Sequence, residues 1–454
     1  MVPADRPSGN RSDRTEWVWG AYDCRMALRL SAALLLLILG GCATSAPSSG
    51  TALTDSPAPS SPTSPGTLES DRVARDLDQL LSVLDTVHPD AWHSIDRDAF
   101  VAELEAYEAA LPQLTPAEAV VELMRITALL SSAGRDGHQF ALPQPGMEGP
   151  SLPLTVYEFA DRVTITAATP PHEGLVGNQI TAIAGTPIDE VLAAVEPLVP
   201  RDGPATVPAF RPIFLPRTEV LRGLGIVGDG PIELTMVDDG REIVESVEPI
   251  PFDAYLAFLG DRAMHQLPAS DRPQYLRDPE PLTIAEMGDG VLYIRYRNVV
   301  PPSVGDARDL IEGGSVRRLV LDLRQNPGGD NGTYGPLLDL VRDFAEAQPG
   351  ELRVLIDRVT FSAASNLATE IEHSTDAVFI GEPMAGGLNF WDDVNFVRLD
   401  SLPVPMQVGV STRYWQFAEP DDPRLTIEPD AAIPSTAKDF LEGRDPVLEA
   451  AIAR

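Results

Sequence analysis

A serine at the start of an expected helix is the side chain best placed in this sequence to act as a nucleophile. Ser362 follows the apolar strand-like run 354–356 and opens a run of small residues, 363–365. Its hydroxyl would lie at the positive end of the helix dipole. The N–H of Ala363 would face the oxyanion formed from a substrate carbonyl. Serine at such a position more often only caps the helix, so Ser362 alone does not identify an enzyme.

Two turns elsewhere in the chain carry residues that would complement a nucleophile. A strand-like run, 319–323, leads into the turn 326–329, with the sequence NPGG. Its two glycines permit close approach to the backbone and unusual dihedral angles. Residues 134–138, with the sequence GRDGH, place His138 after a glycine-bounded turn. Each segment taken alone is more often a plain surface turn.

Histidine is the better candidate for a general base because lysine is almost absent. Lys438 is the one lysine, and it lies in a polar segment shortly after 429–430, far along the chain from Ser362. Six histidines remain as candidates: His88, His93, His138, His172, His265 and His373.

Together these segments resemble the C-terminal processing and tricorn-type serine peptidases. That family shows, in order, D-G-H, a PDZ-like unit, D-L-R-x-N-P-G-G, S-A-x-x and G-E-P-x-x-G. This chain has the same order at 136–138, 322–329, 362–365 and 381–386. The resemblance spans about residues 70–454 and implies a mixed α/β fold, with a crotonase-like layered β/α catalytic core.

The resemblance also implies a role for individual residues. Ser362 becomes the nucleophile, and the oxyanion hole combines the N–H of Ala363 with one from Gly328 or Gly329. The lysine-using branch of the family holds its base in a turn where this chain has glycines, at 386–387. The chain is therefore similar to the histidine-using branch, and His138 becomes the base that activates the serine.

A base of this kind needs an acid to orient it. In the histidine-using branch a Glu late in the chain contributes, shortly before a P-D pair. Asp422 lies closest to that position here, and Asp136 is a local alternative two residues before His138. Each of these acids is otherwise an ordinary solvated charge. Ser365, one helical turn after Ser362, is the rival nucleophile.

The segments between the motifs predict three folded regions. Residues 69–139 are expected to form a helical lobe, because apolar residues recur at three- and four-residue steps and Thr115 to Glu118 form a capping box. Residues 140–270 look β-rich, and 177–188 resembles part of a PDZ-like domain, which either binds peptide as an added strand or is purely structural. Residues 271–454 alternate strands and helices, as a layered α/β catalytic domain does.

The start of the chain is predicted to be a targeting signal. A short apolar run at 34–39 follows basic residues and precedes Gly40-Gly41-Cys42, as in a bacterial lipoprotein signal. Residues 1–41 are therefore expected to be removed, with Met26 as a possible true start, and Cys42 to carry the lipid. Residues 42–68, rich in Ser, Pro and Thr, would form a flexible tether. An ordinary signal peptide with an incidental cysteine is the alternative.

The composition of the chain limits the partners and cofactors that are expected. The net charge of −34 disfavours nucleic acid as a partner. Two cysteines with no metal-binding spacing predict neither a disulfide scaffold nor a metal site, and no other cofactor is expected.

The leading hypothesis is a serine endopeptidase, lipid-anchored on the extracytoplasmic side of the cell membrane, that acts on peptides or unfolded proteins. The alternatives are a catalytically silent binding lipoprotein and an esterase-type hydrolase.

Overall fold

The computed structural model describes residues 65–453, apart from 239 and 262–271. The predicted signal at 1–41, Cys42 and the tether up to residue 64 lie outside the described residues. Helix α2 (Pro65–Val87) begins inside the segment predicted as tether, because proline is well suited to the first turn of a helix. Among the helices within the described ranges, none is both long enough and apolar enough to span a membrane.

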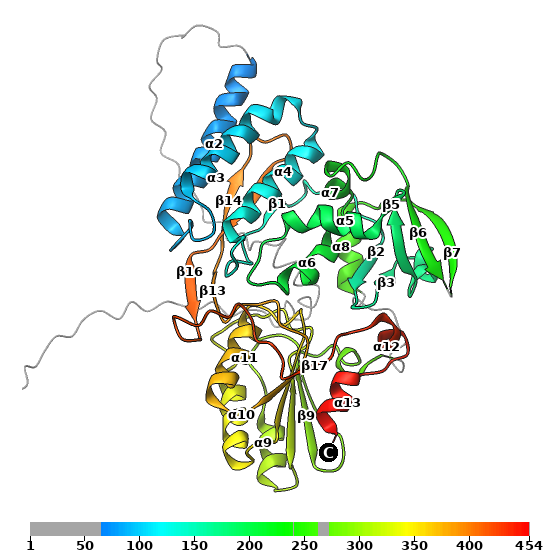
Figure 1. The fold of residues 1–454 in the computed structure, drawn as a ribbon, viewed down its shortest axis with the longest axis vertical. Helices are drawn as coiled ribbons and strands as arrows, with labels where there is room; N and C mark the ends of the chain where they lie inside the picture. Colours follow the sequence, from blue (N-terminus) through cyan, green and yellow to red (C-terminus); the bar gives the residue numbers. More distant parts are fainter. Residues whose placement is uncertain (1–64, 239, 262–271, 454) are drawn as a thin grey trace, which may run out of the picture.

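The first helices form a lobe that is completed by a distant part of the chain. Helices α3 (Arg97–Ala110) and α4 (Pro116–Ala128) follow α2, and the predicted capping box at Thr115 and Glu118 is present. Helices α2 and α4 pack on a small antiparallel sheet of β1 (Ala141–Pro143), β15 (Met406–Val410) and β14 (Asn395–Leu399), and α3 packs against both helices. Figure 1 shows this sheet beside α2 and α4, with β14 reaching up from the lower body. The lobe and the C-terminal region are therefore interleaved.

A second body is built on an antiparallel sheet with the order β2-β3-β4-β6-β7. Its strands are β2 (Leu154–Glu158), β3 (Val163–Ala168), β4 (Gln179–Ile183), β6 (Ile232–Asp238) and β7 (Arg241–Val247). The short strand β5 (Thr186–Pro187) pairs with β4 after a tight turn with positive φ at Ala184 and Gly185. Helices α5 (Ile188–Val195), α6 (Thr206–Phe214), α7 (Thr218–Gly223) and α8 (Phe252–Asp261) accompany it. We call this body the β-rich domain.

The third body is a layered core around a six-stranded sheet with the order β17-β12-β11-β10-β9-β8. Strands β9 (Val291–Tyr296), β10 (Arg318–Asp322), β11 (Leu352–Ile356), β12 (Val378–Gly381) and β17 (Ala431–Ala432) are parallel, and β8 (Leu282–Glu286) pairs antiparallel. Side chains of α10 (Gly335–Ala347) and α11 (Ala363–Ser374) cover one face, near α9 (Gly305–Glu312), while α13 (Pro446–Ile452) covers the other. The predicted mixed α/β class is confirmed.

The sheet explains where the predicted motifs meet. The segments 323–329, 357–362 and 382–387 follow the carboxyl ends of the neighbouring strands β10, β11 and β12. Ligands of open parallel sheets bind at that edge. An excursion of β13 (Asn389–Asp392), β14, β15 and β16 (Arg413–Gln416) starts from the same edge and carries the chain to the helical lobe. A further short helix, α12 (Ala437–Leu441), precedes α13.

Candidate active site

Ser362 occupies a strained backbone position at the start of α11. Its φ is 52° and its ψ is −129°, and its side chain makes no capping hydrogen bond to the helix. A non-glycine residue rarely adopts a positive φ, because Cβ crowds the backbone, and such strain is concentrated at functional sites. The hydroxyl is half-buried and donates to Asp392 Oδ2 at 3.3 Å. The simple helix-cap interpretation of this serine therefore does not fit its geometry.

The glycine turn lies directly against the serine. A Cβ on Gly328 would come within 2.6 Å of Ser362 Cβ and 2.9 Å of Ala363 N. The N–H of Gly328 already donates to Asn326 Oδ1 at 2.9 Å. Within the described part of the chain, the N–H groups of Ala363 and Gly329 have no hydrogen-bond acceptor. Of the two glycines, Gly329 is thus the one with a donor left for a ligand.

His138 approaches the serine from the other side of the site. Its ring stacks on Phe361, with 4.4 Å between centroids, and on Phe390, with 5.5 Å. Its Nε2 lies 3.4 Å from Asp392 Oδ2, the same oxygen that accepts the Ser362 hydroxyl. Neither ring nitrogen of His138 makes a well-aligned hydrogen bond to any described residue. One carboxylate oxygen therefore lies between the hydroxyl and the imidazole.

Backbone pairing between distant segments brings His138 to this place. The histidine lies in the turn between α4 and β1. Trp391 N donates to Arg135 O at 2.7 Å, and Gly409 N donates to Phe140 O at 2.9 Å. The turn is therefore held between β13 and β15, which both belong to the excursion from the sheet edge.

Asp136, the local alternative for the acid, has partners of its own. It is fully buried, and its carboxylate accepts from His88 Nε2 at 2.9 Å, from Ser411 Oγ at 2.7 Å and from Gln139 Nε2. Together with His93, 3.6 Å away, these hydrogen bonds outweigh burial and lower the pKa of Asp136. Asp136 anchors the turn that carries His138, and no contact joins it to the His138 ring.

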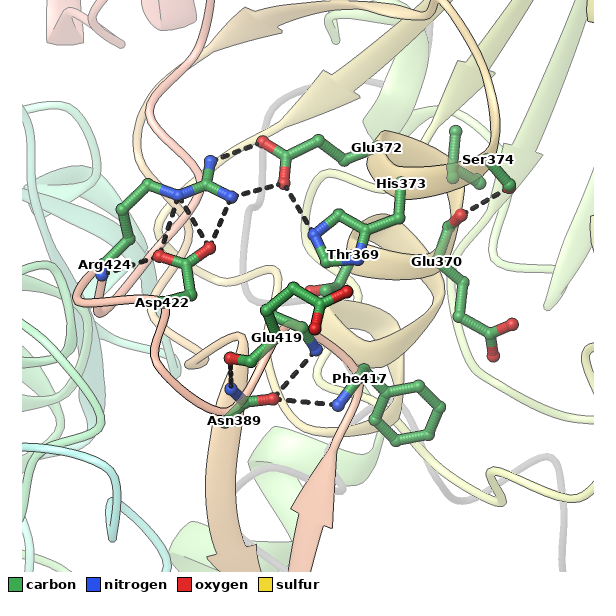
Figure 2. A network of polar contacts seen from close by, with 12 residues as sticks. Thr369, Glu370, Glu372, His373, Ser374, Asn389, Phe417, Glu419, Asp422 and Arg424 are labelled. Carbon is green, nitrogen blue, oxygen red and sulfur yellow. Dashed lines mark hydrogen bonds and ion pairs between the residues drawn. The ribbon is translucent and has the colours of Figure 1, made fainter.

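The carboxylate of Asp422 also makes its contacts away from His138, while its backbone carbonyl accepts from Arg135 Nη2 at 2.8 Å. Its carboxylate pairs with Arg424 at 2.8 Å, and Arg424 in turn pairs with Glu372. Figure 2 shows this network beside the helix that carries Glu372 and His373. The Arg424 guanidinium lowers the pKa of Asp422. The structure thus does not bring Asp422 to the imidazole, because Arg424 holds its side chain in a separate ion-pair cluster.

Two acids that the sequence did not single out do lie at the site. Asp392 ends β13 and touches both Ser362 and His138. Asp202, fully buried in the loop before α6, accepts from Gly137 N at 2.5 Å. Burial raises the pKa of Asp202 to about 6, against the opposing influence of the nearby His138. Neither aspartate has a local sequence signature.

The remaining candidates are placed as follows. Ser365 is fully buried, and its hydroxyl donates to Thr360 O at 3.3 Å. A Cβ on Gly386 would overlap the Ser365 hydroxyl, so position 386 requires glycine.

The one lysine of the chain, Lys438, is exposed on α12. Among the described residues, no group of three or more His, Cys, Asp or Glu side chains is arranged to hold a metal ion.

Comparison with solved structures places this arrangement in a known fold. The structure of mature CPAF complexed with lactacystin matches with a TM-score of 0.54 at 15% identity, covering 85% of this chain and 97% of that one. A serine-to-alanine mutant of CPAF matches with a TM-score of 0.55 at 15% identity, covering 83% and 95%. The photosystem II D1 C-terminal processing protease matches at 16% identity with a TM-score of 0.37, covering 84% and 98%.

These similarities concern the fold, at identities too low to carry more. The predicted resemblance to the C-terminal processing and tricorn-type peptidases is confirmed at that level. No protein-family model matches the sequence, and no curated protein matches it either.

Proposed function

We propose that the protein is a serine endopeptidase, with Ser362 as the nucleophile and His138 as the base. The observation that carries this proposal is the convergence on Asp392 Oδ2, which accepts the Ser362 hydroxyl at 3.3 Å and lies 3.4 Å from His138 Nε2. The strained backbone of Ser362 and the unused N–H groups beside it support the same conclusion. CPAF, which shares the fold, has been solved as a serine-to-alanine mutant.

The reaction would proceed through an acyl-enzyme. The Ser362 oxygen attacks the peptide carbonyl while its proton passes to His138, which becomes an imidazolium. The N–H groups of Ala363 and Gly329 donate to the oxyanion of the tetrahedral intermediate. His138 then gives the proton to the departing amine, and the peptide C–N bond breaks. A water molecule then attacks the ester carbonyl while His138 takes its proton, and His138 returns that proton to the Ser362 oxygen as the C–O bond breaks.

Asp392 has a defined part in this scheme. The serine hydroxyl donates to Asp392 and not to the imidazole. The carboxylate holds the hydroxyl beside His138 Nε2, and its charge favours the imidazolium that forms next. Hydrogen bonds of catalytic groups are often loose before substrate binds, and a peptide in the site would bring the hydroxyl to the imidazole.

The substrate and location extend the same proposal. A peptide or an unfolded protein is the substrate class that fits an endopeptidase with this fold. We propose that the protein works on the extracytoplasmic side of the cell membrane, held by lipid on Cys42. The support is the sequence pattern at 34–42.

The test compares two serines on the same helix. Wild-type protein should react with a fluorophosphonate probe and cleave an unfolded protein, and Ser362→Ala should do neither. Ser365→Ala is the matched control, because Ser365 is fully buried and donates to a backbone carbonyl. It should keep both activities.

Three other outcomes would each contradict a part of this proposal. Labelling that survives in Ser362→Ala would refute the nucleophile assignment. A wild-type protein that reacts with no probe would be a silent binding protein. Turnover of an ester panel, with unfolded protein and peptides left intact, would identify an esterase-type hydrolase.

A further inference from the structure

His138 lacks the acid that a catalytic imidazole needs on its second nitrogen. Both ring nitrogens are enclosed, and Nδ1 has no partner among the described residues. Asp392 lies at Nε2, on the side of the serine. Asp136 is committed to His88, Gln139 and Ser411. Asp392 favours the imidazolium from the Nε2 side, and a further negative charge would stabilise it from another direction.

His138 influences the charged states of Asp393 and Asp202, so both carboxyl groups are near enough to act on the ring in return. Asp393 is a poor candidate, because its side chain is 48% exposed and pairs with Arg413 at 3.7 Å. Solvent screens a charge in that position. Asp202 is fully buried, so its charge acts on its surroundings with little screening.

The carboxylate of Asp202 joins the two turns that frame the site. Its Oδ1 accepts from Gly137 N at 2.5 Å, and its Oδ2 accepts from Gly387 N at 3.3 Å. Gly137 immediately precedes the base, and Gly387 belongs to the turn after β12. A Cβ on Gly137 would come within 3.0 Å of the Asp202 carboxyl carbon, so glycine is required there. The sequence D-G-H thus leaves room for a carboxylate from another body of the protein.

The backbone around Asp202 is fixed to the same turn. Arg135 N donates to Asp202 O at 2.8 Å, and Asp136 N donates to Arg201 O at 3.0 Å. Thr206 Oγ1 accepts from Asp202 N at 3.1 Å and donates to Ala385 O at 2.8 Å. The position of the carboxylate is therefore set from the β-rich domain, whose helix α6 begins at Thr206.

We propose that Asp202 is the positioning residue of the His138 base, and that its negative charge stabilises the imidazolium formed when Ser362 loses its proton. This inference rests on the proposed function. It means that two parts of the protein contribute to the base: the helical lobe carries the His138 ring, and the β-rich domain carries the Asp202 carboxylate.

The charged state of Asp202 is maintained at a cost in stability, as is common for functional groups. Burial raises its pKa from 3.8 to about 6, while His138 and the N–H groups of Gly137 and Gly387 favour the charged form and Asp136 opposes it. The neighbouring Arg201 pairs with Glu196 at 3.6 Å. Above pH 6 the carboxylate is therefore ionised, in the range where a histidine base works.

The experiment measures the rate of fluorophosphonate labelling against pH in wild-type protein and in Asp202→Asn. We expect the maximal rate to fall on the order of 10- to 100-fold, less than the ~10²–10⁴-fold that a general base itself contributes. We also expect half-maximal labelling at a lower pH, because the imidazolium loses its stabilising charge. A purely structural residue would lower the rate without moving that pH.

Thr206→Ala is the control, because it loosens the same segment and keeps the charge. Any loss of rate in this variant should come with an unchanged pH of half-maximal labelling. An unchanged profile in Asp202→Asn would overturn the inference and leave the peptidase proposal standing. Labelling of Ser362→Ala at the wild-type rate would instead overturn the proposed function, and this inference with it.

A second measurement needs no catalysis. The folded-state pKa of Asp202 is raised, so its contribution to stability is fully present below pH 3.8 and is lost as pH rises through about 6. The free energy of unfolding of wild type, minus that of Asp202→Asn, should therefore decrease across this window. An increase would show that the carboxylate is stabilised by its surroundings, contrary to the inference.

Discussion

At the scale of residues, the site depends on where backbone N–H groups are already committed. The sequence leaves Gly328 and Gly329 as equal candidates for the oxyanion hole. The structure separates them, because Asn326 accepts the N–H of Gly328 and no described residue accepts that of Gly329. A strained Ser362 then presents its hydroxyl beside the free N–H groups. Which backbone N–H groups already have an acceptor depends on the fold, and no local sequence pattern reveals it.

The roles of Asp422 and His138 can be separated by mutation. Asp422→Asn should leave labelling and cleavage within about twofold of wild type, because Asp422 is held by Arg424 in an ion pair outside the site. The pair is partly exposed and contributes at most about 1 kcal/mol. His138→Ala should lower the labelling rate by ~10²–10⁴-fold, since the general base is lost. Steady-state cleavage and probe kinetics on both variants provide the check.

Equal and large losses in the two variants would restore Asp422 as the acid that orients His138. A normal rate in His138→Ala would remove the base from the scheme altogether.

The sequence identified some of these residues and missed others for a physical reason. Ser362 stands out because small residues follow it at a helix start, and His138 because glycines flank its turn. Asp392 and Asp202 follow no such pattern. With 68 acidic residues in the chain, an aspartate in a loop carries no signal of its own. Their importance comes from contacts with segments at least thirty residues away along the chain, and Asp422 was chosen instead by its distance along the chain.

At the scale of elements, the excursion from β13 to β16 is what makes the site possible. Periodicity predicts the helices of the lobe and the strands of the core, because both patterns are local. The sheet β1-β15-β14 pairs strands more than two hundred residues apart, and its strands are only three to five residues long. No local pattern reveals such pairing. The predicted boundary at 271 therefore separates segments that fold together.

A buried histidine-aspartate pair locks the turn of His138 to this sheet. Asp90 N donates to His88 Nδ1 at 2.9 Å, so the ring proton lies on Nε2 and points to Asp136. Ser411, which follows β15, donates to the other oxygen of the same carboxylate. The ring of His93 stacks on Trp391 of β13, with 4.1 Å between centroids. His88 and His93, two of the six histidines that the sequence offers as candidates for the base, thus support the turn that carries His138.

Removing His88 should therefore destabilise the lobe. His88→Ala leaves the buried Asp136 carboxylate short of a donor, and we expect a loss of about 3 kcal/mol in the free energy of unfolding at pH 7. The folded-state pKa of Asp136 is lowered, so this contribution is present above the unfolded pKa and is lost as pH falls through the folded one. Urea denaturation at pH 7 and at pH values below 3.8 measures both effects, and the difference between variant and wild type should narrow only in that more acidic range.

His373→Ala is the comparison, because that ring is 34% exposed and lies 3.7 Å from Glu372. It should cost less than about 1 kcal/mol. Similar losses in the two variants would mean that the buried cluster does not lock the turn.

At the scale of the whole molecule, the site lies where three bodies meet. The core supplies Ser362, the helical lobe supplies His138, and the β-rich domain supplies Asp202. Arg358, four residues before the serine, also reaches the β-rich domain, where its Nη1 donates to Glu158 O at 2.8 Å while its Nη2 pairs with Glu382. Any movement of the β-rich domain would therefore change the surroundings of the base and of the nucleophile together.

The net charge of the chain bears on how the protein would stay at a membrane. A formal charge of −34 repels anionic lipid headgroups, so electrostatic attraction cannot supply a second binding signal. If the protein is anchored at a membrane as proposed, the attached lipid must supply the binding. One acyl chain gives only marginal, reversible binding, whereas a diacylglycerol on Cys42 inserts two chains, at roughly 0.8 kcal/mol for each buried CH₂ group. The proposed lipid on Cys42 is sufficient for a stable anchor.

This argument predicts how the full-length protein fractionates when it is expressed in bacteria. Wild type should sediment with membranes at both low and high salt, since hydrophobic insertion is not screened. Cys42→Ser should move to the soluble fraction, and Cys24→Ser should behave as wild type, because Cys24 precedes the apolar run. Metabolic labelling with a radioactive fatty acid should mark wild type and Cys24→Ser alike. If Cys42→Ser stays with the membranes at all salt concentrations, another part of the chain anchors the protein and the lipoprotein proposal fails.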